Sequence, residues 1–152
     1  MVRLALILFL PLLLMGAQKV EIRANSFYAD EKKGENILSG NVFVKRGEDI
    51  LQAAKLVVFT DKKRRAKLYH ATGDARFEIA LKDKFYKGRG DELIYDATKD
   101  SYEISGNAFV EELTSKQRLT GKKIIIDKRQ ESYSVVSDEK KPVKFVFELD
   151  EK

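Results

Sequence analysis

The sequence predicts an all-β protein, and three observations carry that prediction. Apolar and polar residues alternate at period two over most segments beyond residue 18, as half-buried strands require. Val, Ile, Phe, Tyr and Thr, which favour strands, are frequent in those segments. Turn-forming clusters recur about every 8 to 12 residues, which is typical of a β-sandwich, a jelly roll or a short β-solenoid. The two prolines, Pro11 and Pro142, lie outside the central region, so strands there run without interruption.

The first seventeen residues have the layout of a secretory signal peptide. Arg3 supplies a positive start, Leu4 to Met15 form an apolar run of twelve residues, and the small Gly16 and Ala17 follow. An uncleaved anchor is the alternative, but twelve apolar residues fall short of the roughly 20 that span a bilayer. We therefore predict a signal peptide over residues 1–17, cleavage after Ala17, and one exported domain over residues 18–152.

Composition narrows the chemistry and the partners. The chain has no cysteine, which excludes disulfides, thiolate metal sites and cysteine nucleophiles. Its formal net charge of +5 becomes +4 once Arg3 leaves with the signal peptide. A basic protein attracts polyanions, and export argues against nucleic acid, so phosphorylated lipid or acidic glycan is the better candidate.

A repeat organises the chain after the signal peptide. The segment Leu-Ser-Gly-Asn-Val-Phe-Val at 38–44 recurs as Ile-Ser-Gly-Asn-Ala-Phe-Val at 104–110, and Ala-Thr-Gly-Asp-Ala-Arg-Phe lies between them at 71–77. The glycines stand at 40, 73 and 106, so both intervals are 33 residues (73 − 40 and 106 − 73). Tyr69 and Tyr102 each precede a glycine by four residues, and Tyr133 precedes Ser137 likewise in a weaker fourth copy.

Each glycine segment is followed by a second apolar segment after a polar turn. These second segments are residues 54–59, 91–95 and 122–126. We therefore expect strands of about six to eight residues, two to a repeat. The predicted turns are 45–49, 61–65, 96–100 and 127–130, each rich in Asp, Lys, Arg or Gly.

The alternation predicts which side chains face the interior. In residues 73–81 the charges Asp74, Arg76 and Glu78 share one side, so Gly73, Ala75, Phe77, Ile79 and Leu81 fall on the other. The aligned segments extend this inward set to Leu38, Ile104, Ile124, Ile126, Val143, Leu149 and the candidate groove residues. The candidate lipid-binding groove consists of Val20, Ile22, Val42, Val44, Leu56, Val58, Phe77, Ile79, Leu93, Tyr95, Ala108, Val110, Phe145 and Phe147.

The glycines on this predicted inner line leave two interpretations open. Gly40, Gly73 and Gly106 line up with Ala75 and Ala108, so facing sheets would leave a slot between them. Such a dry slot suits an acyl chain, since each buried methylene contributes roughly 0.8 kcal/mol. The alternative is an ordinary packed core with no ligand.

The ends of a repeat array are open sheet edges. The final predicted strand, Lys141 to Leu149, has an apolar inner side and no prominent guard against pairing. An edge of this kind accepts a strand from another molecule, which predicts head-to-tail association of copies.

The quoted segments resemble the LptA/OstA-like family of lipopolysaccharide-transport proteins over about residues 20 to 149. The resemblance rests on the order and spacing of residues 39–44, 52–58, 88–96, 104–110 and 121–126. It implies a twisted, partly open β-jelly roll, a V-shaped double sheet. It also implies a periplasmic bridge that holds lipid A in an apolar groove, with Val20, Ile22, Phe77 and Tyr95 at lipid-facing positions.

The resemblance also implies partners. An LptC-like inner-membrane protein would meet the N-terminal edge, an LptD-like outer-membrane translocon the C-terminal edge, and copies would stack head to tail. The atypical residues before the cleavage point leave room for a membrane-anchored LptC-like role in the same pathway. A structural or adhesive β-repeat module with a filled core is the alternative from a different class.

Residues that could carry catalysis are scarce. His70 is the only histidine, residues 96–100 lack the alternating ligands and glycine of a calcium loop, and Gly88-Arg89-Gly90 lacks the strand-to-helix setting of a phosphate loop. We predict no enzymatic activity, no metal and no cofactor. The basic runs at 62–65 and 128–129 are read as solubilising turn tips, with contact to lipid phosphates as the functional alternative.

Overall fold

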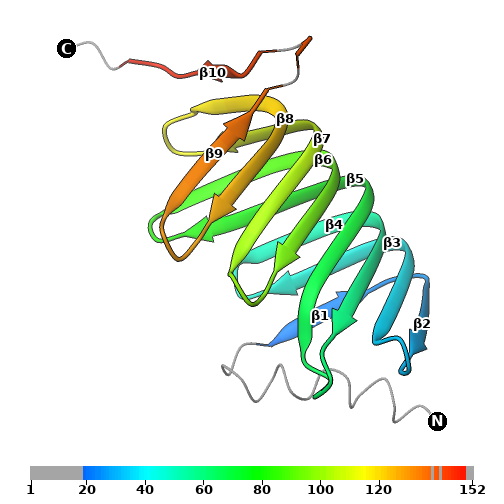
Figure 1. Cartoon of the computed structure of the whole chain (residues 1–152). Helices are drawn as coiled ribbons and strands as arrows, with labels where there is room; N and C mark the ends of the chain where they lie inside the picture. The colour runs from blue at the N-terminus through cyan, green and yellow to red at the C-terminus, as the bar shows by residue number, and fades with distance from the viewer. Residues whose placement is uncertain (1–18, 138, 141, 150–152) are drawn as a thin grey trace.

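The computed structural model describes residues 19–137, 139–140 and 142–149, and its ten strands form one antiparallel sheet (Figure 1). The predicted signal peptide and its cleavage point lie outside the described residues. The sheet order is β1-β3-β4-β5-β6-β7-β8-β10, with β2 pairing with β3 and β9 pairing with β8. The strands are β1 (Val20–Arg23), β2 (Ser26–Asp30), β3 (Glu35–Arg46), β4 (Asp49–Thr60), β5 (Ala66–Leu81), β6 (Lys84–Asp96), β7 (Ser101–Glu112), β8 (Arg118–Asp127), β9 (Ser132–Val136) and β10 (Lys144–Val146).

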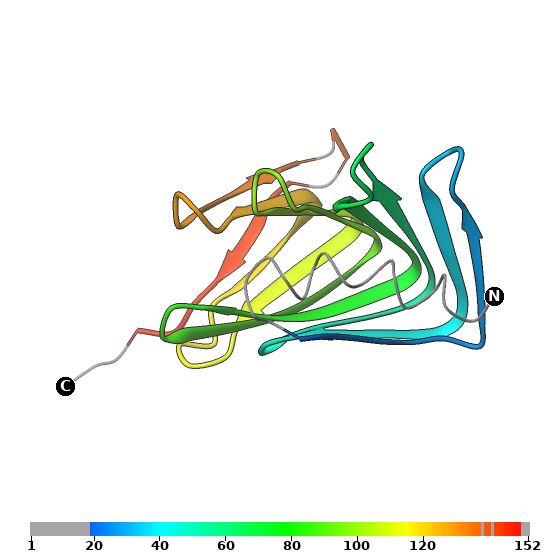
Figure 2. The same cartoon turned by 90° about the horizontal axis from the view of Figure 1, so that it is seen from below.

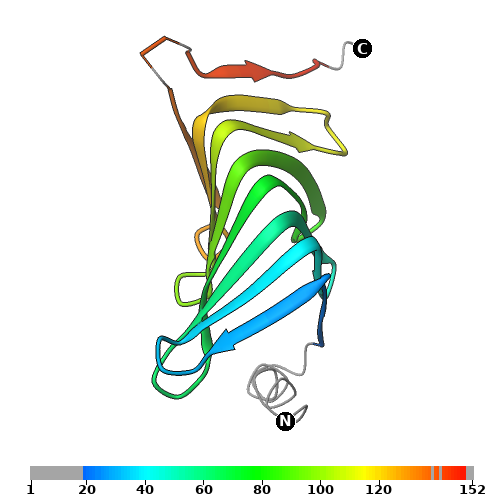
Figure 3. The ribbon, with the colours of Figure 1, turned by 90° about the vertical axis from the view of Figure 1, so that its right-hand side faces the viewer.

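The sheet folds over on itself, because each long strand turns a sharp corner near its middle (Figures 2 and 3). The ladder shows a register shift at this corner in every pair from β3–β4 to β7–β8. The corner divides the sheet into two limbs. Limb 1 carries the turns that join β2–β3, β4–β5, β6–β7 and β8–β9, and limb 2 carries those that join β3–β4, β5–β6 and β7–β8. The predicted V-shaped, partly open jelly roll is confirmed.

The repeated glycines make the corner, and the prediction that they face the interior is wrong. Gly40, Gly73 and Gly106 have φ of +82°, +83° and +78°, and the Asn or Asp after each also has positive φ. These two residues oppose a single residue of the neighbouring strand in three pairs: β3 with β4, β5 with β6, and β7 with β8. Such an arrangement is a β-bulge, and it bends the sheet. A Cβ on Gly73 would lie 2.5 Å from the Cβ of exposed Ala54, so this glycine occupies the convex side.

The bulges also explain why the observed strands are longer than predicted. β3 to β8 have 10 to 16 residues instead of six to eight. A bulge bends the ladder without ending it, so two predicted short strands join into one that crosses the corner. In β4, β6 and β8 two consecutive residues point outward at the corner, so the inward-facing positions change from odd to even or the reverse. In β3, β5 and β7 three consecutive residues lie on the convex side, so the inward-facing positions stay in the same alternation.

The four predicted turns lie between strands as expected, and aspartates stabilise three of them. Asp61 accepts hydrogen bonds from the backbone N–H of Lys63 (2.8 Å) and Arg65 (2.9 Å). Asp96 accepts from Thr98 N–H in the β6–β7 turn, and Asp127 accepts from Gln130 N–H in the β8–β9 turn. The hydrogen bond from Arg65 N–H is the main cause that lowers the pKa of Asp61. The hydrogen bond from the Thr98 hydroxyl, with the backbone N–H groups of the same turn, lowers the pKa of Asp96.

The core lies between the limbs and is narrowest at the corner. Fully buried aliphatic side chains from four strands meet there: Leu56, Leu93, Ile104 and Ile124. Small residues face them, and a Cβ on Gly90 would lie 2.5 Å from Ile104 Cγ2. The glycines of β6 therefore make room for close packing inside the fold, whereas the glycines of the repeat do not.

Two short strands complete each edge of the sheet. At one edge β1 pairs with the limb 2 half of β3, and β2 pairs with its limb 1 half. At the other edge β10 pairs with the limb 2 half of β8, and β9 pairs with its limb 1 half. The last predicted strand, 141–149, shortens to β10, and Lys141 lies outside the described residues. Its predicted inward side chains, Val143, Phe145, Phe147 and Leu149, are 39–77% exposed, because the opposite limb does not extend over this edge.

Candidate functional site

The inner surface of the V brings most of the predicted groove residues together. Ten of them belong to the buried core: Val42, Val44, Leu56, Val58, Phe77, Ile79, Leu93, Tyr95, Ala108 and Val110. Val20 and Ile22 of β1 are partly buried and pack against that core. Phe145 and Phe147 lie outside it, about half exposed, with ring centroids 5.2 Å apart.

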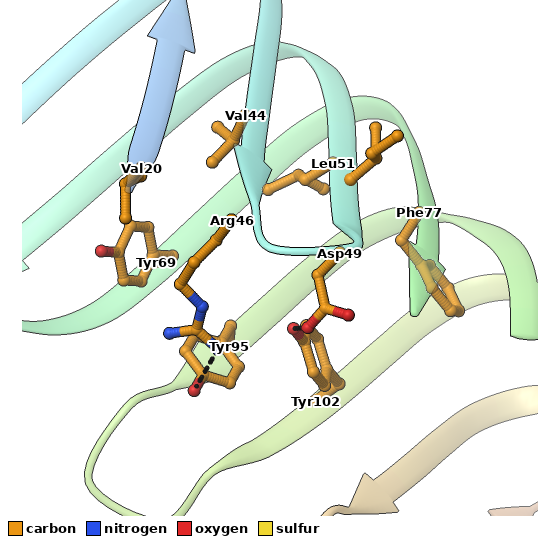
Figure 4. Close-up of a pocket in the computed structure, with 10 residues that line it drawn as sticks. Val20, Val44, Arg46, Asp49, Leu51, Tyr69, Phe77, Tyr95 and Tyr102 are labelled. Atoms are coloured by element: carbon orange, nitrogen blue, oxygen red, sulfur yellow. Dashed lines mark hydrogen bonds between the residues drawn. The ribbon is translucent and has the colours of Figure 1, made fainter. Parts of the chain in front are cut away.

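A cavity opens towards the mouth of the V, away from the packed corner (Figure 4). Its cavity volume is about 50 Å³, it is partly open to solvent, and its walls are mainly apolar. Its lining residues come from β1 and β3 to β7, which lie far apart in the chain: Val20, Val44, Arg46, Asp49, Ile50, Leu51, Tyr69, Phe77, Tyr95 and Tyr102. Walls of this kind favour hydrocarbon over water, because they present little polar surface for water to bind.

Aromatic rings form the limb 1 wall of this cavity. The ring centroid of Tyr95 lies 5.8 Å from that of Tyr69 and 4.6 Å from that of Tyr102. Phe77 stacks on Tyr102 from limb 2 at 6.5 Å. Burial raises the pKa of all three phenols, that of Tyr95 to about 12, so they are neutral at physiological pH.

The rim of the cavity is polar, and its side chains come from both limbs. Arg46 Nη2 donates to Tyr95 Oη at 2.9 Å (Figure 4). The Tyr95 hydroxyl in turn donates to Asp100 Oδ1 at 2.8 Å. Asp49 Oδ2 accepts from the Tyr102 hydroxyl at 3.0 Å and from Lys128 Nζ at 3.1 Å. The pKa of Arg46 is raised: burial acts to lower it, but the bond to Tyr95 and the neighbouring acidic groups outweigh burial.

A second cavity lies at the C-terminal end of the inner surface. Its cavity volume is about 20 Å³, it is also partly open, and Phe145 of β10 forms part of its wall. The other lining residues come from β5 to β9 and the β7–β8 turn: Leu81, Tyr86, Val110, Glu112, Gln117, Leu119, Ile124, Ile126 and Tyr133. The two cavities place open apolar surface near both ends of the same inner face.

Some residues of the first cavity were not predicted from the sequence to belong to it. Tyr69 and Tyr102 stand four residues before a repeat glycine, and that spacing was the available signal for their shared role. Arg46 and Asp49 were assigned only to a turn, because no local pattern shows that they meet residues about fifty positions away. Of the predicted basic tips, Lys128 contacts Asp49, whereas residues 62–65 lie away from both cavities.

Comparison with known proteins fits this geometry. Residues 21–132 match the family described as the LptA/(LptD N-terminal domain) LPS transport protein. The chain belongs to this family. It is therefore a lipopolysaccharide-transport protein and not an enzyme, and the family resemblance inferred from the repeat is confirmed.

Solved structures show the same fold. One is LptH from Pseudomonas aeruginosa, described as the LptA-homologous periplasmic component of the conserved lipopolysaccharide transport device. It superposes with a TM-score of 0.78 at 20% identity, covering 88% of this chain and 97% of LptH. No curated protein sequence matches the chain.

Over the described residues, no group of three or more His, Asp or Glu side chains is placed to hold a metal ion. Within the same part of the chain, no helix is long and apolar enough to cross a membrane.

Proposed function

We propose that this member of the LptA/LptD N-terminal family carries lipopolysaccharide through the periplasm, with the acyl chains of lipid A between the limbs and the sugars in water. The observation that carries the proposal is the apolar inner face, which is continuous from β1 to β10 and opens into a cavity towards each end. Burying each methylene there contributes roughly 0.8 kcal/mol, so several acyl chains supply ample binding energy.

The groove residues of this proposal are the fourteen predicted from the alternation, together with the cavity tyrosines. Phe77 and Tyr95 are central, because they face the first cavity from opposite limbs. Phe145 extends the apolar path to the C-terminal edge, where Phe147 adjoins it. No residue in this set provides energy for transport, so movement along the groove requires an external drive.

The two edges support a bridging role. At the N-terminal edge Phe27 and Tyr28 are 40% and 60% exposed, and at the C-terminal edge Tyr133, Val136 and Phe147 are about half exposed. Open strands with apolar side chains accept another strand by β-augmentation. We infer that an LptC-like protein pairs with the β1–β2 edge, that an LptD-like translocon pairs with the β9–β10 edge, and that copies stack head to tail.

Lipopolysaccharide binding by variants that introduce a negative charge tests the groove. Phe77→Asp and Tyr95→Asp are expected to weaken binding at least tenfold, because a carboxylate in the cavity opposes hydrocarbon. Phe109→Asp is the matched control: Phe109 lies on the outer side of β7 between inward Ala108 and Val110. Circular dichroism establishes that each variant is folded. Unchanged binding in both groove variants would remove the groove assignment.

Native isolation separates this function from its alternatives. Mass spectrometry of protein purified from its own envelope should find bound lipopolysaccharide, whereas a structural module with a filled core would carry none and take up no apolar dye. N-terminal sequencing of the exported protein decides between a soluble carrier that starts at Gln18 and an anchored LptC-like component.

A further inference from the structure

The inner face of the V is closed in this structure. Ten of the fourteen groove residues are 0–8% exposed, among them Leu56, Phe77 and Leu93. Side chains from the two limbs already fill the corner, and the first cavity opens only at the mouth. A carrier of lipid with several acyl chains must therefore separate its limbs before hydrocarbon reaches this surface.

A line of polar contacts joins the limbs at the mouth, and we call it the seam. It consists of Arg46–Tyr95, Asp49–Tyr102, Asp49–Lys128 and Lys82–Glu131. In each contact the first residue belongs to a turn, or the end of a strand, in limb 2, and the second to limb 1. The contacts join residues 49 to 79 positions apart, so they link the free ends of the limbs and not neighbouring strands.

Asp49 makes hydrogen bonds both within its own limb and across the mouth. Its Oδ1 accepts from Ala80 N–H at 3.0 Å, which fixes the carboxylate to its own limb. Its Oδ2 reaches across the mouth to Tyr102 and Lys128. The side chains of Asp49 and Lys128 are only 14% and 19% exposed, so solvent screens this pair less than a surface pair.

The seam follows the repeat. Lys82 stands 33 residues after Asp49 (82 − 49), at the equivalent turn of the next repeat, and its Nζ lies 2.8 Å from Glu131 Oε1. Its partner lies in the β8–β9 turn, the limb 1 turn that follows the one between Tyr95 and Tyr102. Two successive limb 2 turns therefore make polar contact with limb 1, which points to one device and not an isolated ion pair.

We propose that the seam is a clasp that controls access of lipid to the groove, opening at the mouth while the bulged corner acts as the hinge. This inference rests on the proposed lipid-carrying function. The contacts suit the task because each is a polar contact between side chains that water or an anionic headgroup can replace, whereas the corner is held by the continuous ladder. Arg46 is a half-buried cation whose hydrogen-bond partner is a neutral phenol, so it is the member most readily transferred to a phosphate.

The absence of cysteine allows the clasp to be locked. In the Lys82→Cys/Glu131→Cys variant of the full exported chain, a short cleavable thiol-reactive crosslinker joins the limbs at the seam. Both side chains are exposed, at 68% and 47%, so the replacement leaves the core intact. The matched control is Glu103→Cys/Lys123→Cys, an ion pair of 3.2 Å that joins β7 to β8 within limb 1.

Association of fluorescent lipopolysaccharide is then followed by stopped flow. Crosslinking 82 to 131 is expected to slow association at least tenfold, and cleaving the crosslinker should restore it. Crosslinking 103 to 123 should change the rate less than twofold. Equal rates before and after crosslinking 82 to 131 would overturn the clasp while leaving lipid binding in place. Failure of the uncrosslinked variant and the unmodified protein to bind lipopolysaccharide would overturn the proposed function itself.

A second variant tests the clasp from the opposite direction. Lys128→Met removes one cross-limb partner of Asp49 and keeps most of the side-chain volume. It should speed association of lipopolysaccharide by about threefold or more, because the limbs part more often. A slower or unchanged rate would contradict a restraining role for this contact.

Discussion

Replacing Asp49 by alanine measures how strongly the seam holds the limbs together. The substitution removes the acceptor for Tyr102, Lys128 and the Ala80 N–H. Removing one member of a fully buried ion pair costs about 3–5 kcal/mol, whereas an exposed pair is worth about 0–1 kcal/mol. With both side chains less than one-fifth exposed, we expect Asp49→Ala to lower the free energy of unfolding by about 2–4 kcal/mol.

Glu103→Ala provides the comparison for this value. Its partner Lys123 lies at 3.2 Å, close to the 3.1 Å of the Asp49–Lys128 pair, but the two side chains are 34% and 42% exposed. The pairs thus match in geometry and differ in burial, so Glu103→Ala should cost less than about 1 kcal/mol. Urea unfolding followed by circular dichroism gives both values.

A double-mutant cycle isolates the cross-limb term. Asp49→Ala combined with Lys128→Ala should show a coupling of about 1 kcal/mol or more, since the two side chains are in direct contact. Equal costs for Asp49→Ala and Glu103→Ala, together with no coupling, would refute the argument that burial strengthens the seam.

Two further predictions follow from the corner and from the buried phenols. Gly73→Ala should lower the free energy of unfolding by about 1–3 kcal/mol, because φ is +83° and the new Cβ would contact Ala54; Ala54→Gly should recover the steric part only. The native state binds the phenolic proton of Tyr95 more tightly than the unfolded chain, so this contribution is complete below about pH 10 and is lost as pH rises towards 12. Tyr95→Phe should therefore show a shallower loss of stability between about pH 10 and 12 in urea titrations, and an unchanged slope would contradict the assignment.

The local pattern identified most of the inner face correctly. Ala75, Phe77 and Ile79 face the interior as predicted, because side chains of a strand alternate regardless of what lies opposite. The Asp-rich turns were equally readable, since an aspartate binds backbone N–H groups only two to four residues away. The chain alone thus determined the class of fold, the repeat and the family.

The corner and the ends depended on the tertiary structure. The alternation wrongly placed Gly73 inside, because the bulge puts Thr72, Gly73 and Asp74 together on the convex side and leaves no mark in a hydropathy pattern. Phe147 and Leu149 have inward spacing but are exposed, since burial of a strand requires an opposite limb as well as an apolar side.

What the sequence by itself determined are the properties that arise within a few residues: strand alternation, turn chemistry and a glycine every 33 positions. Only the tertiary structure decided that Arg46 meets Tyr95 and that Asp49 meets Lys128. The physical reason is that these contacts depend on the angle at which the bulges fold the sheet. A change of that angle would leave each strand as it is and separate every residue of the seam.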